Sequence, residues 1–165
     1  MKNSNYYDNS IILSIISTHC METYIKPISV RWADLDPNFH LRHSVYYDYG
    51  AFSRISFLEE HGLNAALMAK HHFGPIIFRE ECVFKKEIRL GDIITIDMQL
   101  LRSRPDHSRW TIQHRIMKNE DGIAAILTLE GAWIDVLQRK LTVPPDTAKQ
   151  VFEQMPRSAQ FEWEK

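Results

Sequence analysis

The 165-residue sequence predicts a single α+β domain in which one long helix packs against an antiparallel sheet. The segment at residues 44–60 has apolar side chains on nearly every side of a helix. Most of the chain after it alternates between apolar and polar residues, which is typical of half-buried antiparallel strands. The composition is that of a globular protein, with 44% hydrophobic and 25% charged residues.

The expected elements follow one another along the chain. Alternation over residues 23–32 predicts a first strand, and Asp36-Pro37-Asn38 is typical of a turn. Ser44 is placed to cap the helix, which is expected to end near Glu60, before Gly62. The later elements expected are a short helix at 64–70, strands over 76–90, 94–100, 110–116 and 123–136, a hairpin turn at 119–122, and a final helix at 146–154.

The long helix is expected to be buried because its apolar residues surround the axis. A sheet that curves around the helix would leave it no exposed side, and this arrangement is the hot-dog fold. A ferredoxin-like or another α+β sheet fits the same pattern. The apolar positions are Val45, Tyr46, Tyr47, Tyr49, Ala51, Phe52, Ile55, Phe57 and Leu58.

Three regions are expected along the chain. Residues 1–22 are an N-terminal extension, residues 23–155 the folded domain, and residues 156–165 a C-terminal tail. The apolar stretch Ser10–Ser17 has the character of a signal-peptide core, but it lacks the positive flank and the small-residue cleavage site. Translation from Met21 is the interpretation we favour, so the extension is expected to be dispensable for folding.

Charge and cysteine content exclude several classes of protein. The formal net charge is −1 with histidine neutral, so no strong positive field predicts a nucleic-acid partner. No apolar run approaches the roughly 18 residues that a membrane-spanning helix needs. Two cysteines, Cys20 and Cys82, are too few for a disulfide framework, which favours a cytoplasmic protein.

A concentration of ionisable residues directly precedes the long helix. The stretch WADLDPNFHLRH, Trp32–His43, contains two aspartates, two histidines and one arginine. It has three interpretations: a turn built from turn-forming residues, a catalytic site, or a set of metal ligands, since carboxylates and imidazoles both bind zinc and iron. The spacing matches no established metal motif, so no metal is expected.

The segment Val30–Tyr49, VRWADLDPNFHLRHSVYYDY, resembles the signature of the 4-hydroxybenzoyl-CoA thioesterase family, which are acyl-CoA thioesterases with the hot-dog fold. The resemblance covers about residues 24–154. It departs from the family at Phe39, where the family has glycine, and at Arg42-His43, where it has an asparagine pair. The matching residues are Arg31, Trp32, Asp34, Asp36, Pro37, His40, Tyr46, Tyr49, Arg54, Phe57, Leu58 and Gly62.

The resemblance implies roles for several residues. Asp36 would be the catalytic carboxylate, acting as nucleophile or general base, and the backbone N–H groups near His43 and Ser44 would stabilise the oxyanion. Asp34 would order the turn. The remaining implied roles are positioning of water or thioester by His40 and His43, and lining of the acyl pocket by Tyr46.

Coenzyme A carries phosphates that need cationic partners. Arg102 and Arg104, with Arg109, surround a predicted hairpin turn and are assigned to substrate binding; Lys85-Lys86 is the alternative. The resemblance also implies a homodimer or homotetramer with the site between subunits. No cofactor is expected, because the CoA thioester is the substrate.

The sequence therefore predicts a thioester hydrolase that converts an acyl-CoA to a free acid and CoA. The alternative is a non-catalytic module that binds acyl-CoA or an acyl-carrier protein, with Phe39 and His43 marking a site that has lost activity. A hot-dog dehydratase is a third possibility, which the Asp-x-Asp-Pro turn disfavours. The acyl group is left open.

Overall fold

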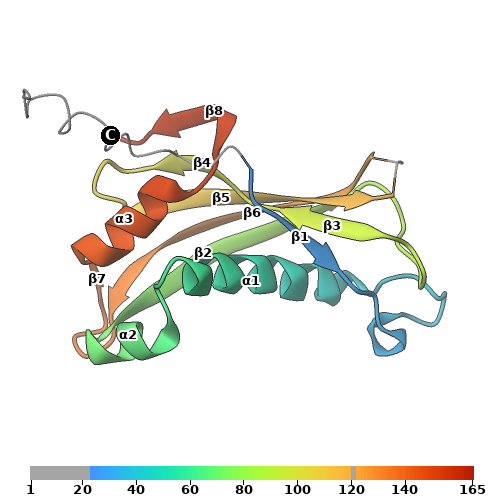
Figure 1. Ribbon diagram of the computed structural model, residues 1–165, viewed down its shortest axis with the longest axis horizontal. Helices are drawn as coiled ribbons and strands as arrows, with labels where there is room; N and C mark the ends of the chain where they lie inside the picture. The colour runs from blue at the N-terminus through green and yellow to red at the C-terminus, as the bar shows by residue number, and fades with distance from the viewer. Residues whose placement is uncertain (1–22, 120–121) are drawn as a thin grey trace, which may run out of the picture.

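The computed structural model describes residues 23–119 and 122–165, so the predicted extension at residues 1–22 lies outside it (Figure 1). The helices are the 3₁₀ turn η2 (Trp32–Asp34), α1 (His43–Glu60), α2 (Ala65–Lys70) and α3 (Asp146–Gln154). The strands are β1 (Ile25–Ile28), β2 (Phe73–Phe84), β3 (Ile94–Asp97), β4 (Gln99–Ser103), β5 (Arg109–Lys118), β6 (Gly122–Asp135), β7 (Lys140–Thr142) and β8 (Arg157–Trp163). None of the helices in these described residues is long and apolar enough to cross a membrane.

All eight strands belong to one sheet, which confirms the predicted α+β class with an antiparallel sheet. At its centre β6 pairs with β2 on one side and with β5 and β7 on the other. Both β3 and β4 pair with β5, while β1 pairs with β3 and β8 with β4. Among the strand pairs that the described residues form, only β4–β8 is parallel.

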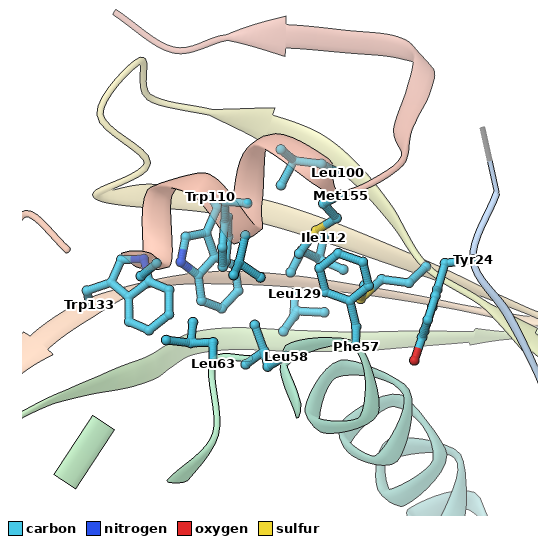
Figure 2. Packing of buried hydrophobic residues seen from close by; sticks show 14 of the residues in the cluster. Tyr24, Phe57, Leu58, Leu63, Leu100, Trp110, Ile112, Leu129, Trp133 and Met155 are labelled. Atoms are coloured by element: carbon cyan, nitrogen blue, oxygen red, sulfur yellow. The ribbon is translucent and has the colours of Figure 1, made fainter. Parts of the chain in front are cut away.

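The predicted alternation is confirmed in the middle of the sheet. Every second residue from Ile94 to Leu100 is buried, as is every second residue from Trp110 to Ile116. The first of these segments was expected as one strand, but it divides at Met98 into β3 and β4. The buried faces of these strands meet α1 and α3 in a core that includes Phe57, Leu129 and Trp133, part of which is seen in Figure 2.

Helix α1 lies across one face of the sheet (Figure 1) and buries Tyr46, Ser53 and Phe57 against it. The expectation that the helix is enclosed on all sides is wrong for the single chain, because Phe52 and Ile55 are each 51% exposed. One sheet covers one side of a helix, so apolar residues that surround the axis leave a second apolar side uncovered.

Three local expectations also differ from the structure. The first strand is shorter than residues 23–32 because the chain turns into η2 at Trp32. Helix α1 begins at His43, and its N-cap residue is Arg42 rather than Ser44. Residues 157–163, expected to belong to a loosely attached tail, form β8 and pair with β4.

Candidate active site

The turn before α1 is closed by the backbone and side chain of Asp36. Its N–H donates to the carbonyl of His40 at 2.8 Å, and its carbonyl accepts the N–H of Phe39 at 2.9 Å. Its carboxylate oxygen Oδ1 accepts the N–H groups of Asn38 and His40 at 2.8 and 3.1 Å. Within the described residues, nothing donates a hydrogen bond to the other oxygen, Oδ2. Asp36 therefore closes the turn through Oδ1, and Oδ2 can accept a proton or contact a bound molecule.

Phe39 takes the backbone conformation for which glycine is suited. Its φ angle is 61°, in the left-handed region that costs a residue with a Cβ roughly 1–2 kcal/mol. The exposed ring of Phe39 lies against Trp32, with ring centroids 5.9 Å apart. The turn therefore keeps the path that a glycine would allow, at the cost of strain at Phe39.

This strain predicts an order of stability for two variants that both lack the Phe39 ring. Phe39→Ala keeps the Cβ and its strain, whereas Phe39→Gly removes both. We expect Phe39→Gly to be more stable than Phe39→Ala by about 1 kcal/mol in urea unfolding. Equal stability, or greater stability of the alanine variant, would contradict the assignment of strain.

Asp36 lies at an open cleft of about 380 Å³ between the start of α1 and the end of β2. Four residues singled out in the sequence meet there: Asp36, His40, His43 and Tyr46. The cleft is completed by Leu41 and by a segment at the end of β2 and beyond it, Phe84, Lys85, Lys86 and Glu87.

The N-terminus of α1 supplies hydrogen-bond donors at this cleft. The first N–H groups of a helix have no intrahelical partner, and the described turn offers no backbone carbonyl to those of His43 and Ser44. The positive end of the helix dipole lies in the same turn and favours a negative charge nearby. The hydroxyl of Ser44 is instead held by Arg42, whose Nε donates to it at 3.0 Å. The side chain of Ser44 is therefore absent from the cleft lining, and its expected contribution is its backbone N–H.

The wall of the cleft is formed by contacts between distant segments. The Nε2 atom of His40 lies 3.1 Å from a carboxylate oxygen of Glu87. The ring of Tyr46 packs edge-on against Phe84, with centroids 4.9 Å apart. Burial, followed by the nearby thiol of Cys82 and carboxylate of Asp36, raises the pKa of Tyr46 to about 12. Tyr46 is therefore a neutral phenol at physiological pH and a wall of the cleft rather than a base.

Asp34 lies outside the cleft lining and is 1% exposed. Its carboxylate accepts Nε and Nη2 of Arg31 at 3.0 and 2.7 Å, and its carbonyl accepts the N–H of Arg42 at 2.8 Å. The hydrogen bond from Arg31 is the main reason that the pKa of Asp34 is lowered. These contacts tie both ends of the turn together, which is what a residue that orders the turn would do.

Arg102 and Arg104 are not brought to Asp36. Arg102 lies on β4 and Arg104 in the β4–β5 turn, at the end of the sheet opposite the start of α1 (Figure 1). The alternative pair, Lys85 and Lys86, lines the cleft because β2 runs antiparallel to α1 and ends beside its N-terminus. Phe84 and Glu87 also line the cleft, although the sequence gives them no role. They are far from Asp36 along the chain and are brought to it only because β2 ends beside the start of α1.

The metal interpretation finds no support among residues 23–119 and 122–165. No group of three or more histidine, cysteine, aspartate or glutamate side chains in these ranges is arranged to hold a metal ion. Asp34 faces Arg31 instead of the two histidines, so the four residues considered as ligands do not converge.

Comparison with known proteins gives matches of sequence and of structure. Residues 30–152 match the thioesterase-like superfamily. A Staphylococcus aureus protein solved in complex with CoA has a TM-score of 0.75 and 17% identity, over 87% of this chain and 90% of that one. A 1,4-dihydroxy-2-naphthoyl-CoA thioesterase from Synechocystis has a TM-score of 0.70 and 15% identity, over 78% and 94% of the two chains. A DHNA-CoA thioesterase from Staphylococcus aureus has a TM-score of 0.70 and 18% identity, over 81% and 91%. No match was found among curated proteins.

The structural matches confirm the predicted hot-dog fold, since they cover most of this chain at TM-scores of 0.70–0.75. The sequence match begins just after β1 and ends within α3. It confirms both the family resemblance and the enzyme class, a thioester hydrolase. The chain belongs to the thioesterase-like superfamily.

Proposed function

We propose that this protein is an acyl-CoA thioesterase that uses Asp36 to hydrolyse the thioester to a free acid and CoA. The observation that carries the proposal is that the carboxylate of Asp36 and the N-terminus of α1 line the same cleft. Thioester hydrolysis needs a carboxylate to attack the carbonyl or to activate water, and donors for the oxyanion that develops. The cleft offers both.

The arrangement assigns a task to each group. Oδ2 of Asp36 either takes the proton of a water that attacks the thioester carbon, or attacks that carbon itself and forms an anhydride that water then cleaves. In both routes the carbonyl oxygen becomes negative and is stabilised by the N–H groups of His43 and Ser44. The bond from carbon to sulfur breaks, and CoA leaves as a thiolate that is then protonated.

The CoA part of the substrate is assigned to the end of β2. Lys85 and Lys86 place positive charge beside the cleft, as phosphate binding requires. The Staphylococcus aureus protein of similar fold was solved with CoA, which supports a CoA-type ligand. Arg102 and Arg104 could contribute only from a second copy of the chain, because in one chain they lie at the far end of the sheet.

The direct test is release of free thiol from a panel of acyl-CoAs of different length and aromatic character, followed with a thiol-reactive dye. Hydrolysis of at least one member that depends on Asp36 supports the proposal. Binding of acyl-CoA with no thiol release across the panel would instead favour the non-catalytic binding module.

We further propose that two copies of the chain assemble through α1 and the edge of β2. Within the described residues, β2 pairs with β6 along one edge and with no strand along the other. The uncovered side of α1 exposes Phe52 and Ile55, and β2 exposes Phe78 and Val83. An unpaired strand edge beside an exposed apolar surface is a site for association.

Phe52→Lys tests this interface, since it places a charge on the uncovered side of α1. The wild-type chain is expected to have at least the mass of a dimer in light scattering, and the variant to shift toward the monomer at micromolar concentration. Leu137→Lys is the matched control, because Leu137 is 70% exposed in the turn between β6 and β7. A monomeric wild type, or the same mass for the wild type and Phe52→Lys, would contradict the interface.

A further inference from the structure

A fully buried histidine lies where α1 crosses the sheet. His114 is on β5, its side chain is 0% exposed, and Leu127 of β6 is its partner across the two strands. Helix α1 approaches both residues closely at Gly50, because a Cβ added there would lie 3.2 Å from Leu127 and 3.5 Å from the ring of His114. The imidazole therefore lies within the contact between the helix and the sheet, shielded from water.

Both ring nitrogens of His114 form hydrogen bonds. Nδ1 lies 2.8 Å from the backbone carbonyl oxygen of Asp97 on β3, and Nε2 lies 3.3 Å from Nη1 of Arg54 on α1. A carbonyl oxygen can only accept a hydrogen bond, and a guanidinium can only donate one. Nδ1 therefore carries the proton of the ring, and Nε2 is the unprotonated nitrogen that accepts from Arg54. The neutral imidazole connects β5 to β3 and to α1.

The charged groups around this ring are balanced only while the ring is neutral. Nη1 of Arg54 also donates to Oε1 of Glu80 on β2 at 3.0 Å, so these two charges compensate each other. The carboxylate of Asp97 accepts the backbone N–H and the Nε of Arg115, at 2.7 and 2.6 Å. Each carboxylate thus already has a cation as its partner. A second proton on Nε2 would meet the Arg54 guanidinium and bring no anion with it.

The folded chain keeps this imidazole neutral far into the acid range. Burial, and after it the charge of Arg54, lower the pKa of His114 to about 3. In the unfolded chain the imidazole is in water, where the pKa of a histidine is about 6.5. Between these two values the unfolded chain binds a proton that the folded chain excludes. The stability that His114 contributes is therefore complete above about pH 6.5 and is lost as the pH falls toward 3.

We propose that His114 is a pH-sensitive catch that holds α1 on the sheet. In the neutral ring Nε2 accepts the hydrogen bond from Arg54, which fastens the helix to β5. A proton on Nε2 replaces this hydrogen bond with two buried cations that face each other, and the packing of α1 on the sheet is lost. The domain therefore unfolds in mildly acidic solution. The catch lies in the body of the fold and acts whatever molecule the cleft at Asp36 binds.

A second buried histidine needs its own control. His107, in the turn between β4 and β5, is 1% exposed, and its Nδ1 lies 2.8 Å from Oγ of Ser103. Its ring packs against Phe152 and Trp163, not against α1. Burial also lowers the pKa of His107, so this residue adds to the acid sensitivity of the wild-type chain. Substituting the two histidines one at a time separates their contributions.

Urea unfolding between pH 5.0 and 7.5 tests the catch. His114→Gln keeps an oxygen that can accept from Arg54 but cannot take up a proton in this range. For each pH unit below pH 6, its ratio of folded to unfolded chain is expected to fall by a factor about ten smaller than the wild-type factor, as one proton requires. His107→Gln should retain that tenfold fall, and His71→Gln, at an exposed position after α2, should behave as the wild type. The same pH dependence for the wild type and His114→Gln would overturn the proposal.

Nitrogen-15 NMR of the unaltered chain provides a test that does not need His114→Gln to fold. The ring signals of His114 are expected to be those of a neutral imidazole with Nδ1 protonated and Nε2 unprotonated. They should remain so from pH 8 down to the pH at which the chain unfolds. A proton on Nε2 in the neutral ring would contradict the contact with Arg54. A folded chain in which His114 takes up its second proton near pH 6.5 would likewise overturn the proposal.

Discussion

Asp36→Asn is expected to lower kcat/KM for thioester hydrolysis about a hundredfold or more, the range expected when acid–base or nucleophilic help is lost. Asparagine keeps an Oδ1 atom that can accept the N–H groups of Asn38 and His40, so the turn should survive. It replaces Oδ2 with an amide that can neither attack the thioester nor take a proton. Thiol release gives the rate, and urea unfolding should show a change below about 0.5 kcal/mol.

Two other aspartates provide controls for this prediction. Asp48→Asn removes the same charge from an exposed position on α1, outside the cleft lining, and should leave the rate unchanged. Asp34→Asn weakens the contacts with Arg31 and should lower the free energy of unfolding. The folded Asp34→Asn enzyme should lose much less of its hydrolysis rate than Asp36→Asn does. If Asp36→Asn hydrolyses the thioester at nearly the wild-type rate, Asp36 is not the catalytic carboxylate. A loss in Asp48→Asn as large as that expected for Asp36→Asn would point to a different carboxylate.

Much of the fold could be predicted because each central strand buries one face. The alternation of apolar and polar residues over β3 to β5 follows from that burial. It predicts that Ile96 and Ile112 are on the buried face, and both are buried in the structure. Strand β8 could not be read in the same way, since its residues show no regular alternation of buried and exposed side chains. Its position depends on a parallel pairing with β4, across more than fifty residues of sequence, which local pattern does not encode.

The candidate site could be predicted in part for a related reason. Asp36, His40 and His43 lie within one turn, so their proximity is a local property of the sequence. The cluster of Arg102 and Arg104 near a turn predicts phosphate binding, but the sequence does not show which end of the sheet that turn occupies, and in one chain it lies at the end opposite the start of α1. Lys85 and Glu87 reach the cleft only through the antiparallel path of β2 along α1, and that is a tertiary property.

Gly131→Ala is expected to reduce the free energy of unfolding by about 3 kcal/mol, at the upper end of the usual cost of overpacking. Gly131 lies on β6 directly opposite Trp110 on β5, and the indole ring folds over it. A Cβ at this position would lie 2.5 and 2.6 Å from Cζ2 and Cζ3 of the ring, and closer still to Cη2. Trp110 has little room to move, because it is 4% exposed and packs against Phe152 at 5.7 Å.

Gly74→Ala is the matched control, since a Cβ there meets no atom within 4 Å and the residue also lies in the sheet. Alanine loses less chain entropy than glycine on folding, so this variant should be as stable as the wild type or slightly more stable. Urea unfolding of both variants therefore separates the contact with Trp110 from the general effect of a methyl group in a strand. Equal stability of the two would contradict the close packing of Trp110 on Gly131.

A double-mutant cycle connects the cost of Gly131→Ala to the Trp110 ring itself. Trp110→Phe removes Cζ2, Cζ3 and Cη2 together, because phenylalanine carries none of the second ring of indole. In that background Gly131→Ala should cost about 1 kcal/mol or less, which gives a coupling energy of about 2 kcal/mol between the two positions. If the glycine substitution costs the same in both backgrounds, the strain lies in the β6 backbone. If the cost disappears with the indole, Gly131 is required because it leaves room for the Trp110 ring to lie over β6 and pack against Phe152.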